Sequence, residues 1–259
     1  MKCTVLVMGR DASVGHCYIT SFFLNKYWAD CPYEKVLCTQ SIAPDDCVYD
    51  RVIYTDKDLI WGDRLHEALK NISTEYVILL AEDFFLRDYV SNSKIEACIR
   101  LCEEERGGAV RLNPPVPFSE HYNEDFDILP PNSIYRICLQ PTLFKKDYLQ
   151  KFAESHFSPW QFERVGSLMS REFEERTFCT IKPVYDCIHA WSHGMWDKEA
   201  YMLMEKSGID KALYEGKKVY PWYMTLRDKL YIKIIGLAPD LITKIRIKMC
   251  EKNEKKLKT

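Results

Sequence analysis

The sequence contains no long apolar run, no CxxC pair and no strong excess of either charge. Because no stretch approaches the roughly 18 apolar residues of a membrane-spanning helix, we expect no transmembrane segment. Lys and Arg total 36 and Asp and Glu 38, so the net charge of −2 gives no general attraction to nucleic acid. The 259 residues are 47% hydrophobic and 29% charged, which is typical of a globular protein and excludes collagen-like, coiled-coil and wholly disordered chains.

The eleven cysteines are the unusual part of the composition. Their number is odd, and several lie within apolar runs, as Cys3, Cys98 and Cys138 do. This pattern favours buried free thiols in a reducing compartment over a disulfide framework or a zinc site. Met1 and Lys2 lead directly into a short apolar strand without the features of a signal peptide, so we expect a cytoplasmic protein.

Short apolar runs alternate with helical patterns in the first half of the chain, as in a doubly wound parallel sheet. The pattern predicts strands at 3–8, 35–39, 51–54, 76–80 and 109–112. It predicts helices at 14–28, at 63–71 with Asp63 as N-cap, and from Ser93 to the Gly107-Gly108 pair. We therefore expect a single α/β, Rossmann-like domain with a mixed, mostly parallel central sheet and a helical C-terminal segment.

The second half alternates less regularly. Residues 113–133 contain five prolines and are expected to form a long loop. Further along, the pattern predicts strands at 134–139 and 184–190 and helices at 143–153 and 159–176, the last opened by Ser158.

Glu82 and Asp83 follow the most apolar strand, YVILL, with only Ala81 between. Ligands of open α/β sheets bind beyond the carboxyl ends of the strands, so these acids are candidates to face a crevice. A carboxylate pair there can hold Mg²⁺ or Mn²⁺ against substrate phosphates, while the alternative is that the acids only cap a turn. His189 and His193 are four residues apart, and one of them is a candidate to complete such a metal shell or to contact a phosphate; we assign His193 to the metal, although a structural histidine is the simpler interpretation of each.

Other polar residues follow other strands at the same edge. Arg64, next to Asp63 at a helix start, is a candidate diphosphate clamp, since a guanidinium binds phosphate bidentately. Arg10 and Asp11 follow the first strand, and Asp11 can accept a hydrogen bond from a ribose hydroxyl or a base. Turn formation at 9–11 and helix capping by Asp63 are the structural alternatives.

Two residues at the start of the helix at 159–176 can act on a sugar. Trp160 can stack on the apolar face of a sugar ring, and Glu163 can serve as a general base towards a hydroxyl. The alternative is a plain helix start, with Pro159 in the first turn and an acid favoured by the helix dipole.

The C-terminal stretch is basic, because residues 217–259 contain twelve Lys or Arg and four Asp or Glu. Its apolar residues recur at helical spacing, with Trp and Tyr at the start. This pattern is typical of an amphipathic helix at an anionic membrane surface, with 221–259 as the contact, or of a core helix followed by a solvated lysine tail.

Four segments together resemble a bacterial GT-A-type glycosyltransferase-like family of cell-surface polysaccharide (capsule or lipopolysaccharide) biosynthesis. They are LIWGDRLHEAL at 59–69, TEYVILLAEDFFL at 74–86, ICLQPTLFKKDYL at 137–149 and SPWQFERVGS at 158–167. The resemblance implies a GT-A-like domain at 1–215, with a nucleotide-sugar half at 1–112 and an acceptor half at 113–215. A basic amphipathic segment at 216–259 follows this domain.

The resemblance also implies an inverting transfer of a sugar from a nucleotide-sugar donor to a glycan or lipid-linked glycan acceptor. The implied base is Glu163, and the implied acceptor-binding residues are Trp160 and Gln140. The nucleotide-sugar side would include Arg10, Asp11, Asp63, Arg64 and Glu82. Asp83 and His193 would hold Mn²⁺ or Mg²⁺, although Glu82-Asp83-Phe84 departs from the DxD letters of the family.

Two other functions fit the same fold. A sugar nucleotidyltransferase uses a similar sheet with a glycine-rich phosphate loop after its first strand, which residues 9–15 match weakly with two glycines and one arginine. A glycan-binding protein without catalytic activity is the second alternative.

Overall fold

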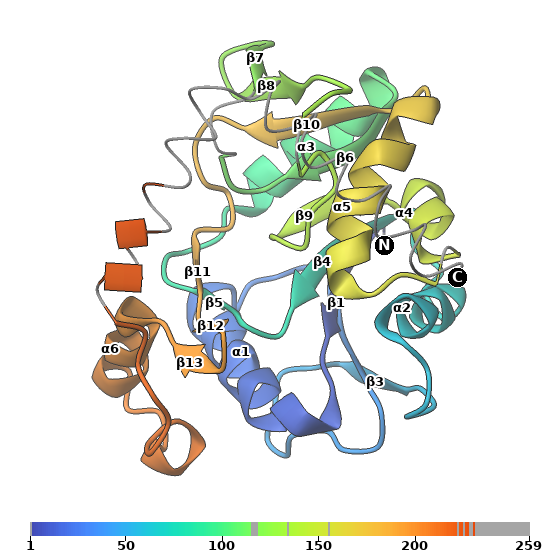
Figure 1. The fold of residues 1–259 in the computed structure, drawn as a ribbon. Helices are drawn as coiled ribbons and strands as arrows, with labels where there is room; N and C mark the ends of the chain where they lie inside the picture. The colour runs from blue at the N-terminus through green and yellow to red at the C-terminus, as the bar shows by residue number, and fades with distance from the viewer. Residues whose placement is uncertain are drawn as a thin grey trace, which may run out of the picture.

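A mixed β-sheet covered by helices on both faces forms the centre of the molecule (Figure 1). The computed structural model describes residues 2–114, 119–133, 135–154, 156–221, 223, 224, 226, 227 and 230. Within these residues the sheet has nine strands, in the order β3 (Arg51–Tyr54), β2 (Glu34–Thr39), β1 (Cys3–Met8), β4 (Tyr76–Ala81), β9 (Thr142–Lys145), β6 (Gly107–Arg111), β10 (Arg176–Thr180), β8 (Phe126–Leu129) and β7 (Glu120–His121).

The helices lie on the two faces of this sheet in two groups (Figure 1). One face packs on α1 (Val14–Tyr27) and α3 (Asn92–Glu104). The other packs on α2 (Trp61–Lys70), α4 (Lys146–Ala153) and α5 (Pro159–Met169). The smaller elements are α6 (Lys198–Lys206), the pair β5 (Phe84–Leu86) and β11 (Cys187–His189), the pair β12 (Trp191–Ser192) and β13 (Met195–Trp196), and the 3₁₀ turns at Asp11–Ser13, Ser170–Glu172 and Lys211–Leu213.

The central strands are apolar throughout because both of their faces are covered. In β4, Tyr76, Ile78 and Leu80 belong to the core on the α1 side, whereas Val77 and Leu79 belong to the core under α2, α4 and α5. This two-residue alternation follows from strand geometry. It explains why the apolar run YVILL predicts this strand correctly.

The predicted α/β fold with a mixed, mostly parallel sheet is confirmed. β3, β2, β1 and β4 run parallel to one another, and β6 pairs in parallel with β10. β9 is antiparallel to both β4 and β6, and β8 is antiparallel to β10. The prediction of one helix over 143–153 is wrong in its first part, because the chain pairs as β9 up to Lys145 before α4 begins.

Three other predictions in the second half are wrong. The helix expected to reach residue 176 ends at Met169, and β10 begins at Arg176. The loop expected at 113–133 contains the paired strands β7 and β8 within its described residues. The strand expected at 184–190 is reduced to β11, which pairs with β5 outside the main sheet.

The strand predicted at 134–139 is also wrong, and the reason lies in α5. The backbone N–H of Ile137 donates to the Ser167 hydroxyl at 3.0 Å, and that of Leu139 donates to Glu163 Oε1 at 3.0 Å. Side chains of a helix therefore occupy donors that a strand would offer to a neighbouring strand. Residue 134 lies outside the described residues.

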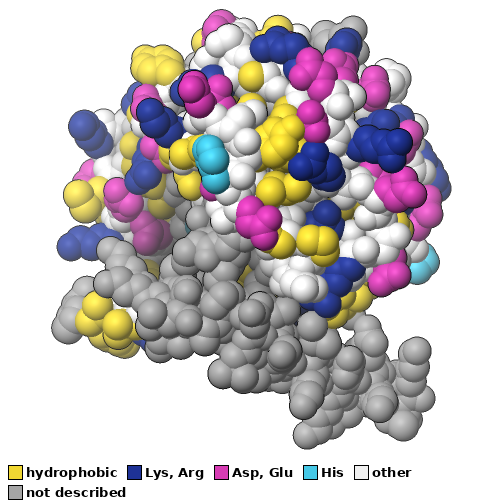
Figure 2. All heavy atoms as spheres, turned by 90° about the horizontal axis from the view of Figure 1, so that it is seen from above, with side chains coloured by type: hydrophobic (Ala, Val, Ile, Leu, Met, Phe, Trp, Pro, Cys, Tyr) yellow, Lys and Arg dark blue, Asp and Glu magenta, His cyan; other side chains and the backbone are white. Residues whose placement is uncertain are grey.

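The C-terminal prediction falls almost wholly on residues that the structure does not describe, since 231–259 lie outside them. The expected membrane contact through 221–259 therefore stays a prediction. Among the described residues, no helix is long and apolar enough to span a bilayer. Figure 2 shows acidic and basic side chains mixed over one face of the molecule, in keeping with the small net charge.

Candidate functional site

Strand direction brings most of the predicted site residues to one edge of the sheet. β1, β2, β4, β6 and β10 end there, and the antiparallel β9 begins there, because Thr142 pairs with both Leu79 and Arg111. The loops that follow these strands carry Arg10, Asp11 and Glu82. In open α/β sheets this carboxyl edge is where ligands bind.

Asp11 joins the loops that follow β1 and β2. Its carboxylate accepts hydrogen bonds from the backbone N–H of Ser41 at 2.8 Å and of Ile42 at 2.9 Å, and from the Ser41 hydroxyl. The hydrogen bonds from Ser41, first from its hydroxyl and then from its backbone, lower the pKa of Asp11 to about 2. Asp11 therefore fixes the loop at 40–42, and a role towards a ribose or base would add to these contacts.

The guanidinium of Arg64, which we predicted to clamp a diphosphate, is bonded to the protein itself. The side chain is buried, and the guanidinium donates to the carbonyl oxygens of Gly9 and Cys38 and to the Thr55 hydroxyl. These carbonyls lie at the ends of β1 and β2. Arg64 thus stabilises the backbone at the sheet edge.

The chain after β1 does not form an open phosphate loop. The N–H of Gly9 donates to Cys38 O at 2.8 Å, and the N–H of Ser13 donates to Arg10 O at 2.9 Å within a 3₁₀ turn. The N–H of Asp11 donates to Gln40 Oε1 at 3.2 Å. Because these N–H donors are already bonded, the weak match of residues 9–15 to a glycine-rich phosphate loop gains no support. The Arg10 side chain is exposed at the edge.

Glu82 and Asp83 lie in different surroundings although they are adjacent. Glu82 Oε1 accepts from the Ser13 hydroxyl at 2.6 Å, and burial together with the negative charge of Asp83 raises the pKa of Glu82. Asp83 Oδ2 lies 3.2 Å from His189 Nε2, and the His189 ring stacks on Phe84 at 4.8 Å. The strand end therefore presents one carboxyl group held by a serine and one paired with a histidine.

Helix α5 brings Glu163 to the same edge. Ser158 caps the helix, with a capping box to Gln161, and the buried Phe162 anchors the first turn in the core. One oxygen of the half-buried Glu163 accepts from Leu139 N–H. In the described part of the chain, Oε2 has no hydrogen-bond partner.

The charge environment of Glu163 connects it to two other groups. Burial raises the pKa of Glu163, while the positive charges of Arg111 and His189 partly oppose this effect. For His189, burial lowers the pKa, but the hydrogen bond and charge of Asp83 and the charge of Glu163 raise it above its ordinary value overall. Glu163, His189 and Asp83 thus form a continuous electrostatic cluster across the carboxyl edge.

Arg111 lies at the end of β6, on the same face of the strand as Ala109, which packs in the core under α2, α4 and α5. Its side chain is only 3% exposed. Nη2 donates to Gln140 Oε1 at 2.6 Å, and Nε is buried without a partner among the described residues. Gln140, predicted to bind an acceptor, is therefore held by a buried cation beside Glu163.

The remaining predicted residues lie in varied settings. Asp63 is not the N-cap of α2, which is Ile60; it lies in the first turn of the helix and bonds His156. Trp160 is 68% exposed near the start of α5, so its ring is free to stack on a ligand. His193 stacks on Tyr220 with ring centres 6.1 Å apart.

A divalent cation fits this edge only with most of its ligands supplied from outside the protein. Across the described parts of the chain, no three His, Cys, Asp or Glu side chains gather as a metal site. Asp83 is bonded to His189 through Oδ2, and Glu82 is bonded to Ser13 through Oε1. Mg²⁺ commonly binds through one or two carboxylates plus phosphates and waters, and Asp83 fits that mode.

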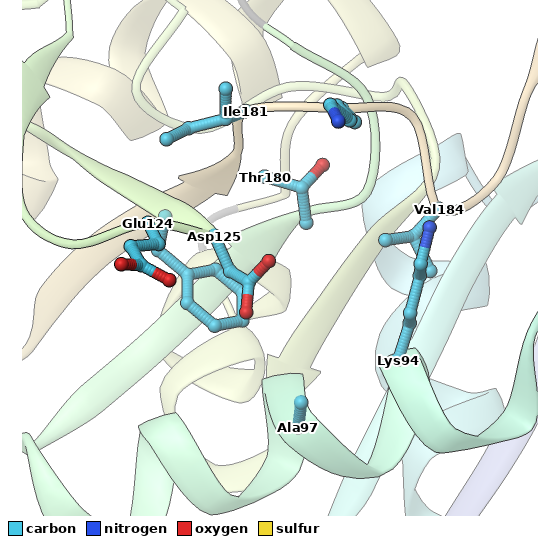
Figure 3. A pocket seen from close by; sticks show the side chains of 9 residues that line it. Lys94, Ala97, Glu124, Asp125, Thr180, Ile181 and Val184 are labelled. Carbon is cyan, nitrogen blue, oxygen red and sulfur yellow. The ribbon is translucent and has the colours of Figure 1, made fainter.

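A separate cavity of about 100 Å³ lies between α3 and the end of β10 (Figure 3). Figure 3 shows Lys94 and Ala97 on the helix, with Asp125 and Thr180 opposite. The Thr180 hydroxyl is buried without a partner in the described structure. None of the predicted site residues lines this cavity.

Sequence reasoning missed one residue of the candidate site, Arg111. Arg111 ends a short apolar strand, which is the same signal that drew attention to Glu82 and Asp83. Of the two histidines four residues apart, the sequence favoured His193 for the metal shell, whereas the pairing of β11 with β5 brings His189 beside Asp83.

No family model matches the chain, and no curated protein matches it. Several solved structures resemble it at low identity. S. aureus TarS 1–349 in complex with UDP is 16% identical over 71% of this chain and 59% of that chain, with a TM-score of 0.47. A nucleotidyl transferase from Methanothermobacter thermautotroptrophicus is 14% identical over 80% of this chain and 97% of that chain, with a TM-score of 0.49.

A cytidylyltransferase from Leptospira borgpetersenii is 11% identical over 85% of this chain and all of that chain, with a TM-score of 0.43. This chain therefore spans 59% of the TarS 1–349 structure and the whole of the cytidylyltransferase structure. Similarity at this level concerns the fold alone. The activity has to be inferred from the residues at the carboxyl edge.

Proposed function

We propose that this chain is a glycosyltransferase that moves a sugar from a nucleotide-diphosphate sugar to an acceptor hydroxyl, with inversion at the anomeric carbon. The observation that carries the proposal is the placement of Glu163. Its carboxylate lies at the ligand-binding edge of the sheet, with a raised pKa and with Oε2 free of described partners. A half-buried carboxylate of this kind is suited to act as a general base.

In this mechanism Glu163 takes the proton of the acceptor hydroxyl while its oxygen attacks the anomeric carbon. The bond from that carbon to the nucleoside diphosphate breaks, and its electron pair leaves with the diphosphate. The hydrogen bond from Leu139 N–H keeps the carboxylate oriented, and burial strengthens it as a base. Holding donor and acceptor in line supplies much of the remaining rate.

The donor side of the site would use the loops after β1, β2 and β4. Arg10 is an exposed cation at the end of β1, and the charges of Arg10, Lys217 and Asp83 all act on the buried His16. Lys217 also lies over the Trp191 ring, 5.2 Å from its centre. Arg10 and Lys217 are therefore the cations that we assign to the diphosphate.

A bound Mn²⁺ or Mg²⁺ would neutralise charge on the departing diphosphate, and Asp83 is the residue that would hold it. One of its carboxylate oxygens, Oδ2, is bonded to His189. His193 stacks on Tyr220, and Glu82 accepts a hydrogen bond from Ser13 through Oε1.

The test compares ligand binding with turnover in the intact chain. UDP and UDP-sugars, with and without Mn²⁺, are screened by thermal unfolding, since a ligand at about 100 times its Kd adds roughly 2.7 kcal/mol of stability. Transfer is then measured with the binding donors and a panel of glycan acceptors. Glu163→Gln should bind the donor as the wild type does and lose about 10²–10⁴-fold in kcat.

Two results would indicate a function other than glycosyl transfer. Release of pyrophosphate from a nucleoside triphosphate and a sugar phosphate would identify a nucleotidyltransferase. Donor or glycan binding without any turnover, unchanged in Glu163→Gln, would identify a binding protein.

A further inference from the structure

We propose that Arg111 and Gln140 form, together with Glu163, the subsite for the attacking atom of the acceptor, and that this subsite selects an alcohol over an amine. This inference rests on the proposed glycosyl transfer. It assigns a role to Arg111 and a direction to each hydrogen bond around the acceptor atom.

Arg111 has an unusual partner for a buried guanidinium. A guanidinium that is 3% exposed is ordinarily paired with a carboxylate, because a buried charge without a counter-charge is costly. Here Nη2 donates to the neutral amide of Gln140 at 2.6 Å, Nη1 donates to the Tyr135 carbonyl at 3.5 Å, and Nε is buried without a partner in the described residues. Glu163 affects Arg111 only through space and has its own hydrogen bond to Leu139.

The contact with Arg111 fixes the orientation of the Gln140 amide. A guanidinium can only donate, so the amide oxygen must face Arg111 and the NH₂ group must point away from it. Gln140 is half-buried, and no described residue accepts from Nε2. The two N–H donors of this half-buried side chain are therefore without a described partner at the sheet edge.

Gln140 and the base Glu163 share Arg111 as a neighbour. Leu139 donates its N–H to Glu163 Oε1, and Gln140 is the next residue along the chain. An acceptor atom between them would give its proton to Glu163 and accept a hydrogen bond from Gln140 Nε2.

A hydroxyl oxygen meets both demands, because it has two lone pairs: one attacks the anomeric carbon and the other accepts from Gln140. A neutral amine has a single lone pair, which the attack consumes, and an ammonium or a carboxylate satisfies only one of the two contacts. The subsite therefore fits an alcohol.

A residue that only stabilised Arg111 and a residue that bound a ligand would differ at position 140. A glutamate there would give Arg111 a buried counter-charge and remove both N–H donors. The glutamine forgoes that ion pair and offers donors to a ligand. Gln140→Glu is thus a variant that keeps the contact with Arg111 and removes both N–H donors of the proposed acceptor contact, while it adds one negative charge beside Arg111 and Glu163.

The experiment compares Gln140→Glu with Gln140→Ala in the full chain, with Gln161→Glu as the matched control. Gln161 caps α5, and a glutamate there preserves the capping box. At pH 7 the Tm of Gln140→Glu should equal or exceed that of the wild type, and the Tm of Gln140→Ala should fall. Gln140→Glu should raise the acceptor KM about tenfold or more and leave the donor KM unchanged, while Gln161→Glu should change neither.

Replacing the reacting hydroxyl of the acceptor by an amine should abolish transfer by the wild type. A Tm that falls equally in both Gln140 variants would overturn the contact with Arg111, and this readout does not depend on turnover. An unchanged acceptor KM in Gln140→Glu, or efficient transfer to the amine, would overturn the subsite. A wild type without turnover on any nucleotide-sugar would instead contradict the proposed function.

Discussion

At the scale of single residues, the carboxyl groups at the sheet edge differ in ionisation because their hydrogen bonds and burial differ. Asp11 accepts three hydrogen bonds, and its pKa falls to about 2. Glu82 accepts one hydrogen bond, from the Ser13 hydroxyl, and Glu163 accepts one, from the Leu139 N–H. Burial is the largest effect on both carboxyl groups, so the pKa of each is raised. The sequence identifies all three as candidates, but it cannot rank them as bases, because burial depends on distant segments.

Removing the charge of Glu163 should stabilise the fold above the ordinary glutamate pKa. Because the folded pKa lies above the unfolded value of 4.5, wild-type stability falls as pH rises from 4.5 through the folded pKa. The glutamine of Glu163→Gln does not ionise, so this variant does not lose stability over that range. Its Tm should exceed that of the wild type at pH 8 and match it at pH 4. A Tm difference of the same size at both pH values would contradict this account.

The loss of Arg64 should affect stability more than any exposed arginine would. Arg64→Met leaves Gly9 O without its guanidinium donor, at a cost of about 1–3 kcal/mol for this buried acceptor, whereas Cys38 O keeps the hydrogen bond from the N–H of Gly9. Urea unfolding measures this cost. Arg64→Lys should recover part of it, since one ammonium can reach one carbonyl, whereas equal stability of both variants and the wild type would rule out the structural role.

At the scale of elements, apolar runs predict the strands that are buried on both faces, such as β1 and β4, almost to the residue. Residues 142–153 show where this reasoning fails. Leu143 and Phe144 fit both a strand and the first turn of a helix, and pairing with β4 and β6 decides for the strand. That decision depends on neighbours that are distant in sequence, so local periodicity could not reveal it.

The capping of α5 offers a test at this scale. Ser158 accepts from Gln161 N–H, and Gln161 Oε1 accepts from Ser158 N–H. Ser158→Ala should cost about 1 kcal/mol of unfolding free energy, while Ser158→Asp, which keeps an N-cap acceptor, should cost much less. Chemical denaturation measures both, and equal losses would show that the serine oxygen does not cap the helix.

At the scale of the whole molecule, the cysteines report on the integrity of the core. The ten cysteines within the described residues are all free, and seven of them are buried. Burial raises the pKa of the partly exposed thiols Cys31, to about 11, and Cys187, to about 12. The prediction of buried free thiols is therefore confirmed for the described part of the chain.

Labelling of thiols should accordingly show two populations. In the native protein at pH 7, a thiol reagent should reach Cys31, Cys47 and Cys187 slowly and spare the seven buried positions: Cys3, Cys17, Cys38, Cys98, Cys102, Cys138 and Cys179. In guanidinium chloride, all eleven cysteines of the chain should react. Mass spectrometry of labelled peptides gives the positions, and rapid native labelling of Cys98 or Cys102 would contradict the packing of α3.

The place of β9 has a consequence for how the molecule is built during translation. β6 leaves the ribosome before β9, yet β9 is the strand that joins β6 to β4. Until Thr142 emerges, the nascent chain holds two apolar strands with open edges, which other chains can pair with. The middle of the sheet therefore closes late and by long-range contacts, which slow folding. A chaperone that shields exposed strands would be needed most during synthesis of the stretch between Arg111 and Thr142.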